Sequence, residues 1–410
     1  MKFLALILVC FIIFSSNAFA VESEFDDLTY TEKKLPTIFN PEFKVEIFAS
    51  GLKWPTTMTF LNDDILVLEK NAGTVRHIVS NGTLISEPVL QVEILESSLE
   101  GGLLGIASKN STVFLYYTES RTNDQENIQN TIFKYQWDGN SLKDPIFIKS
   151  IPTFKSVHNG GIMTVSNDGT VYVVIGDQNA VGGEPTILNP LLIKPVENMG
   201  VVIPIEPPGK PVVIGLRNSF GLTIDPETNN IWYTENGPSR YDEINMVENR
   251  LDGGWPIISG PIEREYYPPI PDTLWKIKAQ IQLIIMGIYN SIILGESYVY
   301  EDPIFSWEKS IAPTAIQFPS YGFDKNRNSV FVGDCNLGNI YNFELNEDRN
   351  GFVFKNYSLS DSVLNVDESN DEILFGEGFG CITDIKFHDD SMYIVSLTEG
   401  KIFKISSDVK

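Results

Sequence analysis

Short strands of alternating polar and apolar residues, each introduced by a polar turn, dominate the chain. Six times, a turn rich in Asn, Asp or Gly precedes a run of β-branched or aromatic residues, often with a second turn and strand behind it. Runs bounded by turn residues in this way predict β-strands. The six turns begin at Asn62, Asn110, Asn167, Asn229, Asn326 and Asp389. Their separations of 48, 57, 62, 97 and 63 residues indicate a structural repeat.

A strand-rich repeat of this length is typical of a β-propeller. Each small sheet cannot bury both faces alone, so the sheets stack around a common axis as blades. We therefore expect an all-β, six-bladed β-propeller of four-stranded antiparallel blades, which forms one domain over residues 43–410. The strand at residues 44–49 precedes the first repeat, and we expect it to pair with the last blade and close the ring.

The long gap between the fourth and fifth repeats holds an insertion at about residues 256–307. It contains the apolar run 281–294, which Gln282, Gly287, Asn290 and Ser291 interrupt. These polar breaks disfavour a membrane span in the mature chain and favour a buried segment or one packed on the rim. No convincing long amphipathic helix is evident in the mature chain.

The first twenty residues have the organisation of a signal peptide. Lys2 is followed by an uninterrupted apolar run at residues 3–14, and the sequence Ala18-Phe19-Ala20 offers a cleavage site with small residues. The apolar run is short for a bilayer-spanning helix, although an uncleaved anchor remains the alternative. We expect residues 1–20 to direct export, residues 21–42 to form an N-terminal extension, and the protein to be secreted or held outside the cytoplasm.

The charge of the chain limits which classes of partner it can bind. The formal net charge is −24, and removal of the signal peptide takes away one further positive charge, Lys2. Nucleic acid and anionic lipid are therefore poor partners. The excess of acidic residues can attract divalent cations. A solvated acidic surface with no specific partner explains the same excess.

Two cysteines remain once Cys10 leaves with the signal peptide. Cys335 follows a strand of the fifth repeat, and Cys381 immediately precedes the strand that opens the sixth. Neighbouring blades place such loops side by side, so we expect a disulfide at the rim of the central site in an oxidising compartment. Two free, buried thiols are the alternative.

Of the three histidines, His158 has the most informative surroundings. It lies in the run His158-Asn159-Gly160-Gly161, where the glycines permit close approach of another backbone or of a ligand. Asp177 ends the following strand and can orient an imidazole. A structural histidine explains the same residues, and the local sequence does not separate the two.

A second constellation begins at Arg217 and Asn218. Arg217 is a fixed cation suited to a ligand that carries carboxylates. Downstream, Gly237 and Pro238 form a turn whose carbonyls can face a hard cation such as calcium. A surface arginine and an ordinary turn remain the alternative for either fragment alone.

Several segments, in order along nearly the whole mature chain, resemble the glucose/sorbosone dehydrogenase family, which includes soluble PQQ-dependent glucose dehydrogenases and aldose sugar dehydrogenases. The segments are Gly51-Leu52 with Trp54-Pro55, residues 100–107, residues 158–161, the stretches around Arg217 and Gly237, residues 312–314, residues 331–334 and residues 382–384. The resemblance implies a propeller that oxidises a sugar or a related small alcohol with a quinone cofactor and passes electrons to an external acceptor.

The resemblance also implies roles for individual residues. His158 is the expected general base that takes the proton of a sugar hydroxyl while hydride leaves the same carbon, and Asp177 orients it. The quinone carries the redox chemistry. The residues expected to contact the quinone are Arg217, Asn218, Asn236 and Asp242, and the carbonyls expected to hold calcium are those of Gly237 and Pro238.

Departures from the family pattern leave a second hypothesis open. Asn336, Cys381 and Thr383 stand where active relatives place cations that meet the carboxylates of PQQ, Ile162 replaces an arginine, and Glu100 replaces a neutral amide. Each missing charge-assisted contact forgoes about 1.5 to 3 kcal/mol. The alternative to an enzyme is thus an inactive propeller of the same ancestry that binds a ligand or a protein outside the cell.

Overall fold

The computed structural model describes residues 35–95, 100–120, 128–153, 157–179, 198–264, 272–319, 323 and 327–407. The expected signal peptide and most of the expected extension lie outside the described residues. One compact unit runs from Pro36 to Lys410. It starts earlier than residue 43 because β1 (Thr37–Ile38) pairs with β25 (Leu374–Glu377) as an outer strand.

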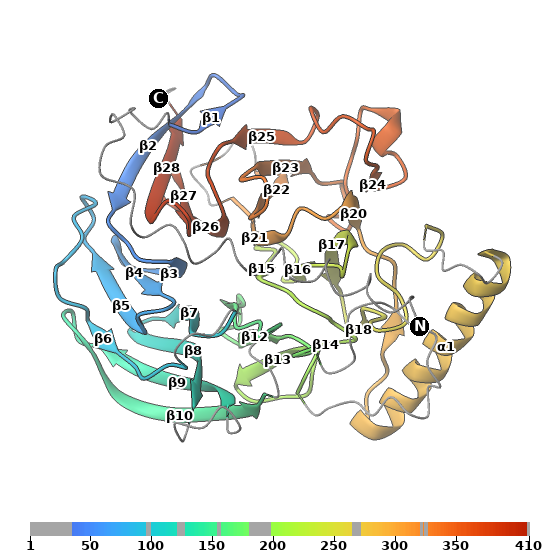
Figure 1. The fold of residues 1–410 in the computed structure, drawn as a ribbon, viewed down its shortest axis with the longest axis horizontal. Helices are drawn as coiled ribbons and strands as arrows, with labels where there is room; N and C mark the ends of the chain where they lie inside the picture. The colour runs from blue at the N-terminus through green and yellow to red at the C-terminus, as the bar shows by residue number, and fades with distance from the viewer. Residues whose placement is uncertain are drawn as a thin grey trace, which may run out of the picture. The chain divides into compact units, whose positions relative to one another are not determined.

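The described strands form six sheets arranged in a ring (Figure 1). Three sheets have four strands each. The first contains β3 (Pro55–Leu61), β4 (Asp64–Glu69), β5 (Thr74–Ile78) and β6 (Leu90–Gln91). The second contains β7 (Leu103–Lys109), β8 (Thr112–Ser120), β9 (Ile128–Trp137) and β10 (Leu142–Pro152). The last along the chain contains β26 (Ile382–His388), β27 (Ser391–Ser396), β28 (Lys401–Ser407) and β2 (Phe43–Ser50).

The other three sheets carry additional short strands. The third sheet contains β11 (Met163–Val165), β12 (Val171–Ile175), β13 (Val201–Glu206), β14 (Val213–Ile214), β18 (Leu251–Asp252) and β19 (Val299–Tyr300). The fourth contains β15 (Gly221–Ile224), β16 (Ile231–Glu235), β17 (Arg240–Val247), β20 (Phe305–Lys309) and β24 (Val363–Leu364). The fifth contains β21 (Pro313–Gln317), β22 (Ser329–Asp334), β23 (Ile340–Glu344), β25 and β1, and a 3₁₀ turn, η3, spans Tyr357–Leu359.

The expectation of uniform four-stranded antiparallel blades is therefore wrong in detail. The strands β18, β19 and β24 add in parallel to the outer edges of their sheets. Each is two residues long and belongs to a connection between repeats. Short parallel additions of this kind pair the backbone groups of the outer edge.

The sheets meet around the axis through their innermost strands. Strand β3 contacts β7, and the contacts continue through β11, β15, β21 and β26 back to β3. Figure 1 shows the same succession, with sheets that follow one another in the sequence also adjacent in space. The all-β propeller that the repeat pattern predicts is confirmed.

Burial on both faces explains why the central strands are almost wholly apolar. Ile65, Leu66, Val67 and Leu68 of β4 are each 0% exposed. Leu66 and Leu68 pack with Leu103 of the second sheet in one apolar cluster. A strand covered on both sides reads as a continuous apolar run, and burying such side chains is the main stabilising term.

The ring closes between the two ends of the propeller sequence. Strand β2 pairs antiparallel with β28, with Lys44 opposite Ser406 and Val45 opposite Ile405. Figure 1 shows these two strands side by side at the seam. The expected pairing of an early strand with the last sheet is confirmed.

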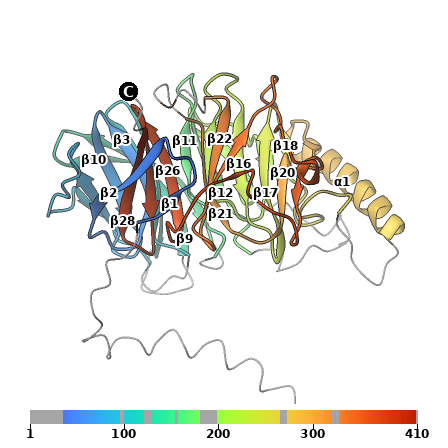
Figure 2. The same cartoon turned by 90° about the horizontal axis from the view of Figure 1, so that it is seen from above.

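The insertion contains a helix that the sequence pattern did not predict, α1 (Asp272–Leu294). Trp275, Ala279, Leu283 and Met286 are spaced to share one side of it and are buried against a small apolar cluster from residues 257–262. Figures 1 and 2 show α1 outside the ring, beside β18 and β20. By length and composition alone, Thr273–Leu294 is long and apolar enough to span a membrane, and 22% of that segment is buried.

Candidate functional site

The loop that carries His158 is held between the second and third sheets. His158 has a φ of 53°, which places a non-glycine residue in the left-handed region. A Cβ on Gly161 would lie 2.7 Å from the Tyr116 ring, and a Cβ on Gly176 would lie 2.1 Å from the His158 carbonyl oxygen. Only glycine at these two positions lets the loop lie this close to its neighbours.

His158 and Asp177 form a buried, hydrogen-bonded pair. The Nδ1 atom of His158 lies 2.6 Å from Oδ1 of Asp177, and the two residues are 8% and 4% exposed. With a carboxylate as its partner, Nδ1 is the donor, so Nε2 is the nitrogen that can accept a proton. The indole nitrogen of Trp255 donates to the other oxygen of Asp177 at 2.8 Å, which fixes the orientation of the carboxylate.

Glu100 anchors the backbone of the same loop. The amide of His158 donates to Oε2 of Glu100 at 2.6 Å. A carboxylate at this position therefore positions the loop directly. Lys70 lies nearby, where burial lowers its pKa and the charge of Glu100 acts in the opposite direction. Sequence reasoning missed Lys70, because its only local signal is a strand end.

Arg217 adjoins the histidine pair through its main chain. Its carbonyl accepts the Asp177 amide at 2.8 Å, and its own amide donates to Oε1 of Glu235 at 2.5 Å. One terminal nitrogen of the guanidinium donates to the Asn236 carbonyl at 3.0 Å. The guanidinium carbon lies 5.4 Å from the centre of the Trp255 ring, within range of a cation–π interaction.

Trp255 thus contacts both halves of the site, because it holds Asp177 by a hydrogen bond and Arg217 by its ring. Sequence reasoning missed Trp255. Its indole nitrogen was the available signal, since a buried tryptophan needs an acceptor.

Asp242 shapes the turn at Gly237. Its Oδ1 accepts the Gly237 amide at 2.8 Å, and its Oδ2 accepts the amides of Ile311 and Ala312, both at 2.7 Å. The carboxylate is 0% exposed, and burial raises its pKa against these hydrogen bonds. Both oxygens are engaged by the backbone, so Asp242 acts through the turn in this structure, and its expected contact with a cofactor stays a prediction.

The carbonyls expected to hold a cation flank the same turn. The Gly237 carbonyl lies 3.4 Å from a terminal nitrogen of Arg217, so it already faces a positive charge. Pro238 is half-buried beside it. The calcium role of the two carbonyls therefore stays a prediction.

Buried polar atoms without a protein partner gather at this site. Leaving such an atom unpaired costs roughly 1–3 kcal/mol, so their concentration indicates a place where a polar ligand supplies the missing bonds. Among the described residues they include Arg217 Nε, Asn218 Oδ1, Asn236 Oδ1, Glu235 Oε2, Asn159 Nδ2 and both amide atoms of Gln178. The set offers donors and acceptors together, as a multifunctional polar cofactor requires.

Two carboxylates lie beneath Arg217 on adjacent strands. Glu235 of β16 is directly opposite Glu243 of β17. Burial raises the pKa of Glu235, and the charge of Glu243 raises it further. Burial also raises the pKa of Glu243 to about 7. The sequence analysis assigned neither residue a role, because a strand pattern does not reveal cross-strand register.

Asn336, Cys381 and Thr383 stand where the family resemblance leads us to expect cations, and we call these three residues the far wall. Cys381 is bonded to Cys335, which confirms the expected disulfide. The two Cα atoms lie 3.7 Å apart, closer than the roughly 4.4–6.8 Å usual for disulfides. The Thr383 hydroxyl donates to the Pro55 carbonyl at 3.2 Å, and Asn336 is exposed with a 3.4 Å contact to the Ser310 carbonyl.

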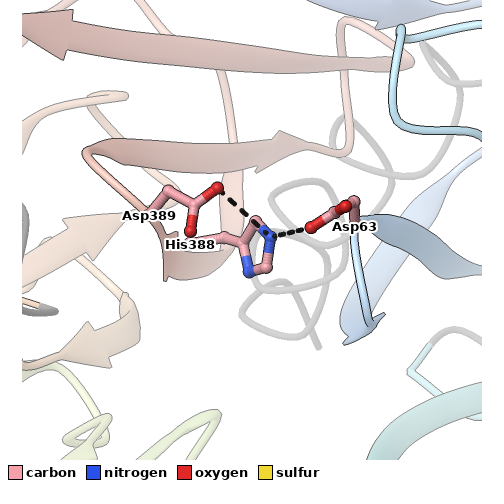
Figure 3. A group of neighbouring side chains, drawn as sticks. All are labelled: Asp63, His388 and Asp389. Carbon is pink, nitrogen blue, oxygen red and sulfur yellow. Dashed lines mark hydrogen bonds and ion pairs between the residues drawn. The ribbon is translucent and has the colours of Figure 1, made fainter.

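The other two histidines lie beside carboxylates. His388 lies 3.1 Å from Asp63 and 3.7 Å from Asp389 (Figure 3). Ligand atoms of these three residues fall within 4.8 Å of one another, but both carboxylates are largely exposed. The group joins the turn of the first sheet to that of the last, while His77 pairs with Asp64 at 2.8 Å.

Comparison with known proteins identifies the family of the chain. The sequence pattern of the glucose/sorbosone dehydrogenase family matches residues 52–279, and the chain belongs to that family. It is 27% identical over 375 residues to an uncharacterized protein of Synechocystis sp., covering 81% of this chain and 82% of the relative. It is 22% identical over 329 residues to the aldose sugar dehydrogenase YliI of Escherichia coli, covering 74% and 81%.

Solved structures show the same fold. The PQQ-bound form of an aldose sugar dehydrogenase from Streptomyces coelicolor superposes with a TM-score of 0.62 at 19% identity, covering 89% of this chain and 98% of that one. The family and the fold together define a sugar dehydrogenase-like oxidoreductase.

Proposed function

We propose that the protein oxidises a sugar or related alcohol outside the cytoplasm, with a PQQ-type quinone as hydride acceptor and calcium at the Gly237 turn. The observation that carries the proposal is the buried His158–Asp177 pair hydrogen-bonded through the main chain to Arg217. This places a base beside a fixed cation and a group of unpaired polar atoms.

His158 supplies the proton-transfer step. Its Nε2 accepts the proton of the substrate hydroxyl, and the charge that develops on the imidazole is stabilised by Asp177. The Trp255 hydrogen bond holds that carboxylate in place. When bound, the quinone would supply the acceptor for the hydride of the alcohol carbon, and an external acceptor would take up the two electrons.

The residues that would hold the quinone lie on one wall of the site. Arg217 supplies a positive charge toward a carboxylate, and the amides of Asn218, Asn236 and Gln178 supply donors and acceptors now without protein partners. Lys70 is a further cation beside Glu100. These groups support binding of a polar anionic cofactor in spite of the uncharged far wall.

The direct test is a titration of the purified protein with PQQ and calcium, followed by the quinone absorbance. Sugars and small alcohols are then screened with an artificial electron acceptor. We expect saturable PQQ binding that calcium strengthens and turnover on at least one sugar. Absence of PQQ binding at micromolar concentrations in the presence of calcium would contradict the proposal and favour a propeller that binds another ligand.

Export is part of the same proposal and rests on residues 1–20. N-terminal sequencing of protein recovered from the medium of a secreting host should begin at residue 21. Recovery only from the membrane fraction, with the first residues intact, would instead indicate an anchor.

A further inference from the structure

The outward side of α1 is an apolar surface that the propeller leaves uncovered. It lies opposite the side of α1 that packs on the insertion, and its side chains are between 40% and 76% exposed. Its members, all aliphatic, are Leu274, Ile277, Ile281, Ile284, Ile285, Ile288, Ile292 and Ile293. We call this set the isoleucine stripe.

The size of the isoleucine stripe is that of half a protein interface. Eight side chains exposed to this degree present on the order of 700 Å² of apolar surface, whereas monomers rarely expose contiguous patches above a few hundred Å². A stable interface buries roughly 800 Å² on each partner. One helix from a second molecule therefore suits the available area.

The spacing of the stripe matches helix-to-helix packing. Ile277, Ile281, Ile284 and Ile288 are separated by four, three and four residues. This is the alternation by which two helices interlock along a seam, with side chains of one seated between those of the other. No charged residue occurs at positions 279–294, so the seam is uncharged from Ile281 to the end of the helix.

A groove beside the stripe gives a partner helix a place to seat. It has a volume of 870 Å³ and runs between α1 and the segment of β19. Ile284, Ile288 and Ile292 form one wall, and Tyr298 and Val299 form the other. Aliphatic side chains from a second copy of the stripe match the apolar part of this lining, which also includes the polar residues Gln280, Ser291, Ser297 and Asp302.

A lipid bilayer fits the same surface less well. Helices that lie in the membrane interface carry aromatic residues on the apolar side and several Lys or Arg residues on the polar side. The stripe is entirely aliphatic, and α1 carries just two basic residues, Lys276 and Lys278. The net charge of −24 also opposes approach to anionic lipid.

The charges at the two ends of α1 set the direction of pairing. Lys278 is exposed near the start of α1, and the last turn of the helix has no basic residue. Lys276 and Glu296 are already paired within the chain, with Glu263 at 3.0 Å and with Lys210 at 3.2 Å. An antiparallel pair brings Lys278 of one copy toward the C-terminal half of the other helix, where the helix dipole is negative. A parallel pair brings like charges together.

We propose that the isoleucine stripe of α1 is the interface of a two-fold symmetric homodimer in which the α1 helices of two copies pack antiparallel. A two-fold axis uses the same patch on both subunits. With the axis near residues 284–285, Ile281 of one copy lies opposite Ile288 of the other. The insertion would thus join two propellers without entering the site at His158.

Sedimentation equilibrium of the full chain from a secreting host tests the proposal. At about 10 µM we expect a dimer, because interfaces of this size give micromolar affinity or tighter. Ile281→Glu alone and Ile288→Lys alone should each weaken dimerisation roughly 100-fold or more, since a charge enters a desolvated seam. Mixing the two variants should restore a mixed dimer, because the opposite charges then face each other across the axis.

The matched control is Ile146→Glu on the outer strand β10, where Ile146 is 50% exposed. This substitution should leave the dimer intact. Single cysteines test the direction, in a chain that also carries Cys10→Ser. Ile284→Cys, near the axis, should cross-link under mild oxidation at least ~10-fold faster than the more exposed Ile292→Cys, because the antiparallel arrangement separates the two copies of Ile292. A monomer at all concentrations, a monomer that binds phosphatidylcholine vesicles, or faster cross-linking at Ile292 would overturn the proposal.

Discussion

The two walls of the candidate site differ in whether their polar groups have partners within the protein. On the His158 wall, buried polar atoms of Arg217, Asn218 and Asn236 have no protein partner among the described residues. On the far wall, Cys381 is cross-linked and Thr383 is hydrogen-bonded to the first sheet. The first wall keeps groups that a ligand must satisfy, at a cost in stability, whereas the second is stabilised internally. The groups available to a ligand and the contacts that stabilise the site therefore lie in different blades.

The sharpest test of the His158 wall removes its base. His158→Ala should lower sugar oxidation by roughly 100- to 10,000-fold, the range attributed to general bases. The loop is also held by Glu100 and Tyr116, so thermal unfolding should change little. Steady-state kinetics with an artificial acceptor measures the effect, and His388→Ala serves as the control. Retained activity would remove His158 from the mechanism.

The disulfide should account for much of the rigidity of the far wall. Its cysteines are 46 residues apart, and closing a loop of that length contributes on the order of 3 to 4 kcal/mol on the chain-entropy model. Cys335→Ser with Cys381→Ser should lower the unfolding midpoint in a denaturant titration accordingly. An unchanged midpoint would mean that neighbouring contacts hold the two blades without the cross-link.

Restoring charge to the far wall should improve ligand binding. Asn336→Lys with Thr383→Arg adds two cations where active relatives place them, and we expect PQQ affinity to rise roughly 10- to 100-fold through charge-assisted contacts. Titration of the quinone absorbance measures the change. Asn336→Gln with Thr383→Gln controls for side-chain size, and equal affinity in the two double variants would show that charge at this wall has no part in binding.

Because Trp255 contacts both Asp177 and Arg217, replacing it should lower activity less than replacing His158 and should also change the pH–rate profile. Trp255→Phe keeps an aromatic ring near Arg217 but removes the hydrogen bond to Asp177, so we expect kcat to fall about 10-fold. The acidic limb of the pH–rate profile should also shift, because the carboxylate that faces His158 gains negative charge density. Trp137→Phe, on the outer part of the second sheet, is the control. A change in KM alone would contradict the positioning role.

The buried carboxylates predict how stability depends on pH. Burial raises the pKa of Glu243 to about 7 and that of Asp252 to about 6. The folded state therefore holds these protons more tightly than the unfolded chain, so their contribution to stability is present at low pH and is lost as the pH rises through the folded pKa values. The unfolding midpoint should be a few degrees higher at pH 5 than at pH 8. Glu243→Gln should reduce that difference, and an equally steep dependence in this variant would place its origin elsewhere.

The repeat pattern predicted the strands because their signal is local. The polar turns at Asn62 and Asn110, for example, each join two strands of one sheet, and the early pairing of β2 with β28 followed from the need to close the ring. The extra strands β18, β19 and β24 were missed, since two residues give no periodicity. The helix α1 was missed because both its inward and outward sides are apolar, which hides the amphipathic pattern.

A site residue could be predicted when its own side-chain chemistry and its neighbours in the sequence indicated a role. His158, Asp177 and Arg217 are reactive or charged types beside glycines, and the structure brings them together. Glu235 and Trp255 act through cross-strand register and through contacts between distant loops, which a linear pattern does not encode. Asp242 had the expected location, but its contacts with the residue 311–312 backbone depend on the packing of two blades.

The pairing of β2 with β28 also bears on how the protein is made. β2 leaves the ribosome before every other strand of the last sheet. It can pair with β28 only after nearly the whole propeller sequence has been synthesised. Such a distant contact slows folding. Until residues 401–407 arrive, both ends of the ring present open strand edges. We therefore expect a chain that ends before residue 401 to keep unpaired strand edges, which favour aggregation.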